Sequence, residues 1–201
     1  LKKGVVEIMF ILDGEIYDKN STYFFLADDG RSTTKYDGDN YWTLEDAYVN
    51  GYNEELNVQY GALVKEDIDP ATRISKDCEL SVGVLYKAVK SINEGDTTYI
   101  TKVEKVDTAD DYIGDPVAVG KDSFQIKSTT TANKVKFTCD NETSFVVVES
   151  LYEKKLNKDN EYVFDKYSVY AGDVNDMFIG IDDEDYFCTV EVVERDKTYA
   201  E

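Results

Sequence analysis

Apolar residues recur at every second position in several stretches of the chain. The clearest runs cover residues 80–88, 135–139 and 186–192, with polar residues at most of the positions between. Side chains of a β-strand alternate between its two faces, so each run predicts a strand with one face toward a core. Tyrosine, phenylalanine, valine, isoleucine and threonine are common throughout, and these residues favour strands.

Turn-forming residues separate the apolar runs. Asp-Gly pairs stand at 13–14, 29–30 and 37–38, and glycine readily adopts the positive φ that tight turns need. Residues 43–46 resemble a helix start, but Gly51 follows within two turns, which leaves a short helix or an irregular strand. The polar residues 65–77 predict a loop with room for one helical turn. Three hairpins are expected, with turns at residues 93–96, 140–142 and 182–185.

Many short strands at regular spacing predict an all-β protein built of two small β-sandwich or barrel-like subdomains. The polar stretch 107–116 ends in Gly114 and Pro116 and is the expected boundary. It divides the chain into an N-terminal β domain, residues 1–110, and a C-terminal β domain, residues 111–201. Each half then has a usual size for a small β domain.

The charge balance is strongly acidic, with 42 Asp and Glu against 22 Lys and Arg and a net charge of -20. Such a field repels phosphate backbones and anionic membrane surfaces, so nucleic acid is not an expected partner. The longest apolar runs, 8–12 and 145–148, are far shorter than a bilayer span, so we expect no membrane insertion by this fragment. The chain starts at Leu1 rather than Met, and we interpret it as a piece of a longer protein.

The absence of histidine narrows the possible chemistry. It excludes Ser-His-Asp and Cys-His nucleophiles and every histidine-ligated metal site. Only carboxylates, Lys, Tyr or Cys remain as acids, bases or nucleophiles, and no glycine-rich phosphate loop or Gly-x-Ser-x-Gly elbow is present. With 42 acidic residues, some pair of carboxylates will have the separation found in glycosidases by chance, so the sequence nominates no catalytic pair. We therefore expect no enzymatic activity.

The three cysteines, Cys78, Cys139 and Cys188, include no Cys-x-x-Cys pair. Each falls in step with the apolar positions of its predicted strand. Free cysteine behaves as a small buried hydrophobe, so we expect reduced thiols in the core.

Two sets of residues are candidates for binding. Tyr36, Tyr41 and Trp42 cluster between two turns and could form a sugar-stacking platform, although tyrosine in strands more often serves packing. The acidic run Asp182, Asp183, Glu184 and Asp185 could supply oxygen ligands for calcium, although solvated turn carboxylates are the default. No spaced calcium-binding loop is present, so no cofactor is expected beyond weakly bound calcium.

Several phrases resemble a known class of protein. They are residues 145–148 (FVVV), 166–172 (KYSVYAG), 177–183 (MFIGIDD) and 189–193 (TVEVV). They resemble the β-rich segments of large secreted cell-surface proteins of gut Firmicutes, which often carry S-layer homology repeats elsewhere. Those repeats are not in these residues. The resemblance implies extracellular display at the cell surface, a structural or adhesive role, and other cell-surface domains or glycans as partners.

The leading hypothesis is therefore a non-enzymatic structural or interaction module of a bacterial cell-surface protein. The alternative is a carbohydrate-binding or accessory module of a secreted glycan-degrading enzyme, and a carboxylate-dependent hydrolase is a third reading. A hydrolase needs a cleft with convergent carboxylates and a carbohydrate-binding module needs an exposed aromatic platform, whereas a structural module needs neither.

Overall fold

The computed structural model describes residues 5–13, 22–49, 52–68, 71, 73–74, 78–139, 143–156, 162–173 and 189–194. These residues form β-strands and two short 3₁₀ turns, without an α-helix in the described ranges. One sheet closes into a five-stranded barrel and a second sheet curls separately, so the predicted all-β fold with barrel-like subdomains is confirmed. Within the same ranges no helix has the length and apolar character to cross a membrane.

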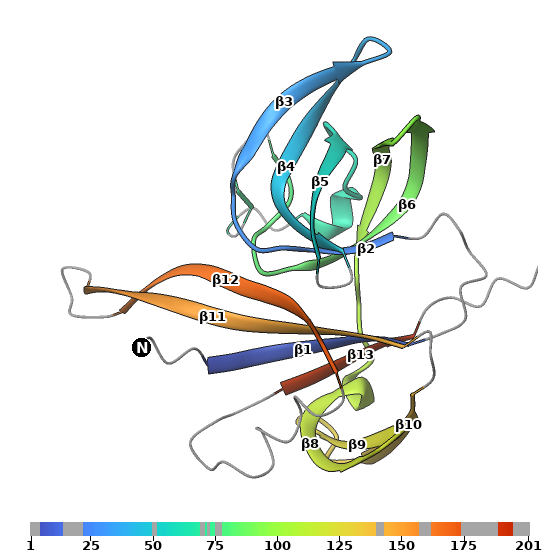
Figure 1. Ribbon diagram of the computed structural model, residues 1–201, viewed down its shortest axis with the longest axis vertical. Helices are drawn as coiled ribbons and strands as arrows, with labels where there is room; N and C mark the ends of the chain where they lie inside the picture. Colours follow the sequence, from blue (N-terminus) through green and yellow to red (C-terminus); the bar gives the residue numbers. More distant parts are fainter. Residues whose placement is uncertain are drawn as a thin grey trace, which may run out of the picture. The chain divides into compact units, whose positions relative to one another are not determined.

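Residues Asp18–Val106 make one compact unit, called here the barrel unit. Its sheet has the strand order β2-β6-β7-β5-β4-β3, and an additional pairing of β2 with β4 closes the barrel. Figure 1 shows the pronounced curvature of β3, β4 and β5 that accompanies this closure. The strands are β2 (Thr22–Leu26), β3 (Arg31–Tyr36), β4 (Asp39–Val49), β5 (Tyr52–Gln59), β6 (Leu85–Glu94) and β7 (Thr97–Lys105).

Side chains from every strand of the closed ring fill the barrel. The rings of Phe24 and Tyr86 stack with centroids 5.6 Å apart, and the core continues into the segment between β5 and β6 through Cys78. Burial of such side chains contributes about 1.5–3 kcal/mol each to folding. The fully buried core side chains include Phe24, Leu26, Leu44, Ala47, Cys78, Ile100 and Val103.

Local sequence explains the irregular positions of the barrel unit. Asp37 and Gly38 form a two-residue turn with φ of 48° and 87°, the geometry that joins β3 and β4 without splaying them. Residues 43–46 belong to β4, whose register shifts between Leu44 and Ala47, so this segment is an irregular strand rather than a helix. Within the described part of the predicted loop 65–77, residues Lys65–Asp67 form a 3₁₀ turn, η1. The hairpin at 93–96 is also present, joining β6 to β7.

The second unit, called here the curled-sheet unit, combines Leu1–Tyr17 with Asp107–Glu201. Its strand order is β10-β9-β8-β13-β1-β11-β12 (Figure 1). Among the side chains that the structure describes, its buried core cluster includes Phe124, Ile126, Phe137, Val147, Val190 and Val192. The strands are β1 (Val5–Asp13), β8 (Ile113–Gly120), β9 (Ser123–Ser128), β10 (Lys134–Thr138), β11 (Ser144–Leu156), β12 (Tyr162–Gly172) and β13 (Thr189–Glu194).

The division of the chain differs from the expected split into residues 1–110 and 111–201. Strand β1 pairs antiparallel with β11 and parallel with β13, so the start of the chain belongs with its end. An apolar strand with neighbours on both sides satisfies all its backbone groups, which a strand alone cannot do. The barrel unit is thus inserted between β1 and β8.

The polar stretch 107–116 is integrated into the curled-sheet unit rather than forming a free linker. It contains the 3₁₀ turn η2 (Asp110–Tyr112) and the start of β8. The Thr108 hydroxyl donates a hydrogen bond to the Glu191 carboxylate, and the Ser128 hydroxyl donates to the Asp110 carbonyl at 2.7 Å. These bonds tie Thr108 to β13 and Asp110 to β9, two strands of the curled-sheet unit.

The hairpin predicted at residues 140–142 is wrong. Strand β10 pairs with β9, whereas β11 pairs with β1 and β12 on the far side of the same sheet. The hairpin predicted at 182–185 lies outside the described residues. Cys78 is a buried thiol, and Cys139 is a partly buried thiol that packs at the margin of the core cluster, and neither is in a disulfide. Cys188 also lies outside the described residues.

Candidate functional site

Three tyrosines form an aromatic cluster on the barrel unit. The ring of Tyr36 stacks on that of Tyr99 with centroids 4.1 Å apart and an angle of 13° between the planes. The ring of Tyr41 meets both edge-on, with centroids 6.4 Å from Tyr36 and 5.2 Å from Tyr99. Tyr41 is only 2% exposed as a result. The three rings therefore pack against one another and leave Tyr41 almost no surface for a ligand.

The sheet register explains how these tyrosines meet. Asn57 of β5 lies opposite Thr43 of β4 and beside Tyr99 of β7, so all three share one face of the sheet. Tyr41 lies on that same face, two residues from Thr43. At the end of β3, Tyr36 lies opposite Asp39 and also belongs to this face. Curvature of the sheet then brings Tyr36 onto Tyr99.

The environment of the cluster raises the pKa of two of its phenols, those of Tyr36 and Tyr41. Partial desolvation raises the pKa of Tyr36, and the nearby Glu94 carboxylate raises it further. Desolvation also raises the pKa of Tyr41, with a smaller contribution from Asp39. A phenol held neutral can donate a hydrogen bond but is a poor nucleophile at neutral pH.

Trp42 belongs to a second aromatic group on the opposite face of β4. Its ring stacks on that of Tyr60 with centroids 4.3 Å apart and planes 12° apart. The guanidinium carbon of Arg31 lies 5.3 Å from the centre of the Trp42 ring, a cation–π geometry. Trp42 also packs against the barrel core, whereas Tyr60 is 38% exposed.

The predicted platform of Tyr36, Tyr41 and Trp42 is therefore divided between two groups. Tyr41 and Trp42 are consecutive in a strand, so their side chains must point to opposite faces. Sequence reasoning missed Tyr99 and Tyr60, the stacking partners. The sequence shows that Tyr99 lies in the second strand of a hairpin and that Tyr60 precedes Gly61 at a turn. It does not show that Tyr99 stacks on Tyr36 or Tyr60 on Trp42, because those contacts depend on the order of the strands.

The acidic residues that the structure describes do not form a metal site. Carboxylates of Asp28, Glu45 and Asp46 converge near Gly30, where a Cβ would lie 3.3 to 3.8 Å from all three. The Asp28 carboxylate accepts the Gly30 N–H at 3.0 Å, and the Asp46 carboxylate accepts the Asn53 amide at 3.2 Å. Throughout the described ranges no group of three or more potential ligands could hold a metal ion. The calcium candidates Asp182, Asp183, Glu184 and Asp185 lie outside those ranges.

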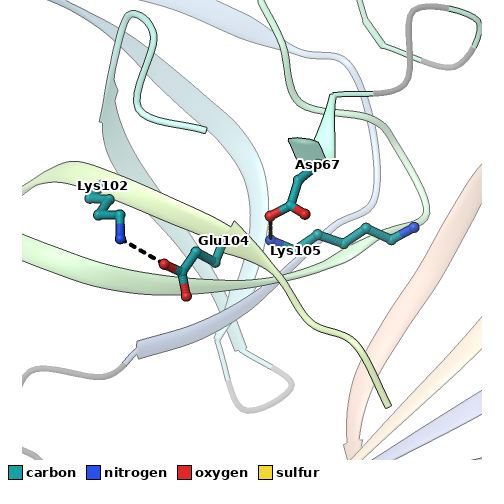
Figure 2. A network of polar contacts seen from close by, with 4 residues as sticks. All are labelled: Asp67, Lys102, Glu104 and Lys105. Atoms are coloured by element: carbon teal, nitrogen blue, oxygen red, sulfur yellow. Dashed lines mark hydrogen bonds and ion pairs between the residues drawn. The ribbon is translucent and has the colours of Figure 1, made fainter. Parts of the chain in front are cut away.

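A polar network on the barrel unit is structural. Figure 2 shows the Asp67 carboxylate accepting the backbone N–H of Lys105 at 2.9 Å, while the Lys105 side chain points away. This bond ties the 3₁₀ turn after β5 to the end of β7. The neighbouring ion pair of Lys102 and Glu104, at 2.7 Å, lies along β7 and is exposed. An exposed pair of this kind contributes about 1 kcal/mol or less.

Comparisons of the chain with family models, with curated proteins and with solved structures each found no match.

Proposed function

We propose that this chain is a non-enzymatic structural or interaction module of a bacterial cell-surface protein. The observation that carries the proposal is the packed interior of the barrel. Phe24, Leu26, Leu44 and Ile100 are each 0% exposed and share one core cluster. A small barrel either fills its interior with side chains or encloses a ligand, and a filled barrel acts through its outer surface.

The surface chemistry supports the same proposal. The aromatic rings of the tyrosine cluster stack on one another, and the charged groups near them are carboxylates at turns. The extracellular, cell-surface location rests on the resemblance of the C-terminal phrases to secreted proteins of gut Firmicutes. The acidic charge of -20 favours solubility and disfavours nucleic acid as a partner.

Two measurements test this proposal. Antibodies raised against the purified chain should label intact cells of the producing bacterium as strongly as permeabilised cells. The purified chain should also show no turnover on panels of polysaccharides and peptides. Antibody labelling of permeabilised cells alone would contradict the proposed location at the cell surface. Turnover abolished by changing one buried Asp or Glu to its amide would replace the module with a hydrolase.

One observation favours a second candidate, a carbohydrate-binding module. Tyr60 is partly exposed and stacks flat on Trp42, beside the guanidinium of Arg31. Sugars stack on exposed aromatic rings, so this pair is the better placed of the two aromatic groups to do so. Trp42 is the single tryptophan of the chain, so its fluorescence reports on this pair alone. Saturable fluorescence changes with cell-wall oligosaccharides, lost in Tyr60→Ala and kept in Tyr52→Ala, would favour this candidate.

A further inference from the structure

Strand β3 forms one edge of the six-stranded sheet, and among the described strands it pairs with β4 alone (Figure 1). The two-residue turn at Asp37 and Gly38 makes Tyr36 and Asp39 a hydrogen-bonded pair. Hydrogen-bonded pairs alternate along an antiparallel ladder, so Thr34 and Ser32 also bond to β4. The Glu45 N–H bond to the Gly30 carbonyl at 3.1 Å continues the same alternation.

The remaining residues of β3 direct their backbone groups outward. Arg31, Thr33 and Lys35 occupy the non-hydrogen-bonded positions, so their N–H and C=O groups point away from β4. No backbone bond to these outward groups comes from any described residue. Thr33 and Lys35 are exposed. Six backbone groups are thus arranged to receive another strand.

The strand lacks most of the features that protect sheet edges. Its register with β4 runs from residue 31 to 36 without a bulge, and its sequence, RSTTKY, contains no proline. Natural edges are commonly protected by bulges, prolines or charges. Only the charges of Arg31 and Lys35 remain here, and they make this short strand basic in a chain of net charge -20.

These two charges define the kind of strand that fits. Arg31 and Lys35 lie four residues apart on the same face of β3, with Thr33 between them. Opposite charges directly across a strand pair are favourable, and like charges are unfavourable. A complementary strand therefore carries acidic residues four positions apart and a β-favouring residue between them. The spacing is the same for parallel and antiparallel pairing.

A second copy of this chain does not fit the edge. In antiparallel pairing of two β3 strands, only one register uses all three outward residues of both copies. That register centres on Thr33 and places Arg31 of each copy opposite Lys35 of the other. Both contacts then oppose like charges, and the large net charges of the two copies repel each other as well.

We propose that the edge of β3 binds an extended segment of another protein by strand addition. The segment has acidic side chains four residues apart, which lie opposite Arg31 and Lys35, and a threonine or β-branched residue opposite Thr33. Main-chain hydrogen bonds supply affinity in this mode and the alternate side chains supply specificity. The inference rests on the proposed function as an interaction module and names its partner class.

Two capped, fluorescein-labelled peptides test the proposal on the full chain by fluorescence anisotropy. One reads Thr-Glu-Val-Thr-Val-Glu-Thr, and the control has lysine in place of both glutamates. The long-range field of an acidic protein favours the basic peptide, so a preference for the acidic one reports β3 itself. We expect the acidic peptide to bind about tenfold more tightly than the basic one. Equal binding, tighter binding of the basic peptide, or no binding of either would overturn the proposal.

Two variants locate the binding. Thr33→Pro removes one outward N–H that the β3–β4 ladder does not use, so binding should be lost while the melting temperature stays near that of the parent. Lys35→Glu should shift the preference toward the basic peptide. This second test remains valid even if Thr33→Pro disturbs the folding of the barrel unit. Retained binding in both variants would place the peptide elsewhere and refute the assignment. A negative peptide result leaves surface labelling and the absence of turnover as independent tests of the proposed function.

Discussion

At the scale of single residues, Tyr86 connects the barrel core to the segment before β6. Its ring stacks on Phe24, and its hydroxyl oxygen accepts the Ser81 backbone N–H at 2.7 Å. The residue is 2% exposed. Burial raises the pKa of the Tyr86 phenol, and this effect outweighs the Ser81 bond, which lowers it.

The raised pKa predicts a loss of stability in alkali. Below the unfolded pKa of about 10 the phenol is neutral in both states and its contribution is complete. As pH rises further the unfolded chain loses its proton first, so the free energy of unfolding falls until the folded pKa is reached. Tyr86→Phe should flatten this fall, while lowering stability at pH 7 by about 1–3 kcal/mol because the Ser81 N–H loses its acceptor. Urea unfolding from pH 7 to 11 measures both effects.

The control for this experiment is Tyr52→Phe. Tyr52 is 67% exposed, so its replacement by Phe should leave the stability at pH 7 unchanged. Burial also raises the pKa of Cys78, so Tyr86→Phe should keep part of the slope. An unchanged slope in Tyr86→Phe would show that other groups dominate the alkaline loss.

Gly114 predicts a second single-residue effect, in the curled-sheet unit. A Cβ at this position would lie 2.2 Å from the Lys127 carbonyl oxygen and 2.6 Å from its carbon, both backbone atoms. Gly114→Ala should therefore force β8 and β9 apart and cost at least about 2 kcal/mol. The matched control is Gly120→Ala in the same strand, where the nearest atoms are 3.4 Å away. Similar thermal stabilities of the two variants would contradict the close approach.

At the scale of elements, the pairing of β4 with β5 includes a buried polar contact. The Thr43 hydroxyl donates to the Asn57 side-chain oxygen at 2.8 Å, and both residues are 6% exposed. Thr43→Val should leave the Asn57 oxygen without this donor and cost about 1–3 kcal/mol. Thr98 makes the same kind of bond to Asn93 at 3.0 Å in an exposed position. Thr98→Val should cost less than about 0.5 kcal/mol by chemical denaturation, and equal costs would argue against burial as the cause.

Strand identities could be predicted from the sequence, and strand partners could not. Alternation at 80–88 and 135–139 depends only on neighbours along the chain. Residues 85–88 belong to β6 and residues 135–138 to β10, whereas residues 80–84 precede β6. The partner of a strand depends on which distant apolar face covers it. For that reason the sequence predicts the wrong unit for β1, and it wrongly predicts that β10 pairs with β11, the next strand along the chain.

In the candidate site, too, features that depend on neighbouring residues could be predicted, and contacts between distant strands could not. Strand alternation already implies that Tyr41 and Trp42 face opposite ways. The stacking of Tyr36 on Tyr99 could not be predicted, because two strands of the sheet stand between them and only the curvature brings the rings together.

At the scale of the whole molecule, the inserted barrel predicts which fragments fold. The barrel unit has its own closed sheet and core cluster, so residues 18–106 alone should melt cooperatively with a β-type circular dichroism spectrum. Residues 111–201 lack β1, which lies between β13 and β11, and should not fold cooperatively. Joining residues 1–17 to 107–201 through a short glycine-serine linker should restore that transition. A cooperative transition in 111–201 alone would show that β1 is dispensable.

The charge of -20 predicts a salt dependence of stability. Raising sodium chloride to about 0.5 M shortens the Debye length to roughly 4 Å and should raise the melting temperature by several degrees. Calcium at equal ionic strength should add a small further rise if the run at 182–185 binds it. Asp182→Asn with Asp185→Asn should remove that increment, whereas Asp110→Asn with Asp111→Asn, which removes equal charge, should keep it. If calcium raises the melting temperature of both variants equally, Asp182 and Asp185 act only through the net charge of the protein.

The position of β1 also has a consequence for synthesis of the protein on the ribosome. Its neighbour β11 begins at Ser144, 131 residues after β1 ends at Asp13. At about 5–20 residues per second, the apolar β1 waits on the order of ten seconds for a partner. The barrel is complete by residue 106, and its first and last strands, β2 and β7, both flank β6, two strand spacings or about 10 Å apart. Early folding of the barrel thus replaces a long flexible loop with a short one, and lowers the entropy that β1 must lose to meet β11.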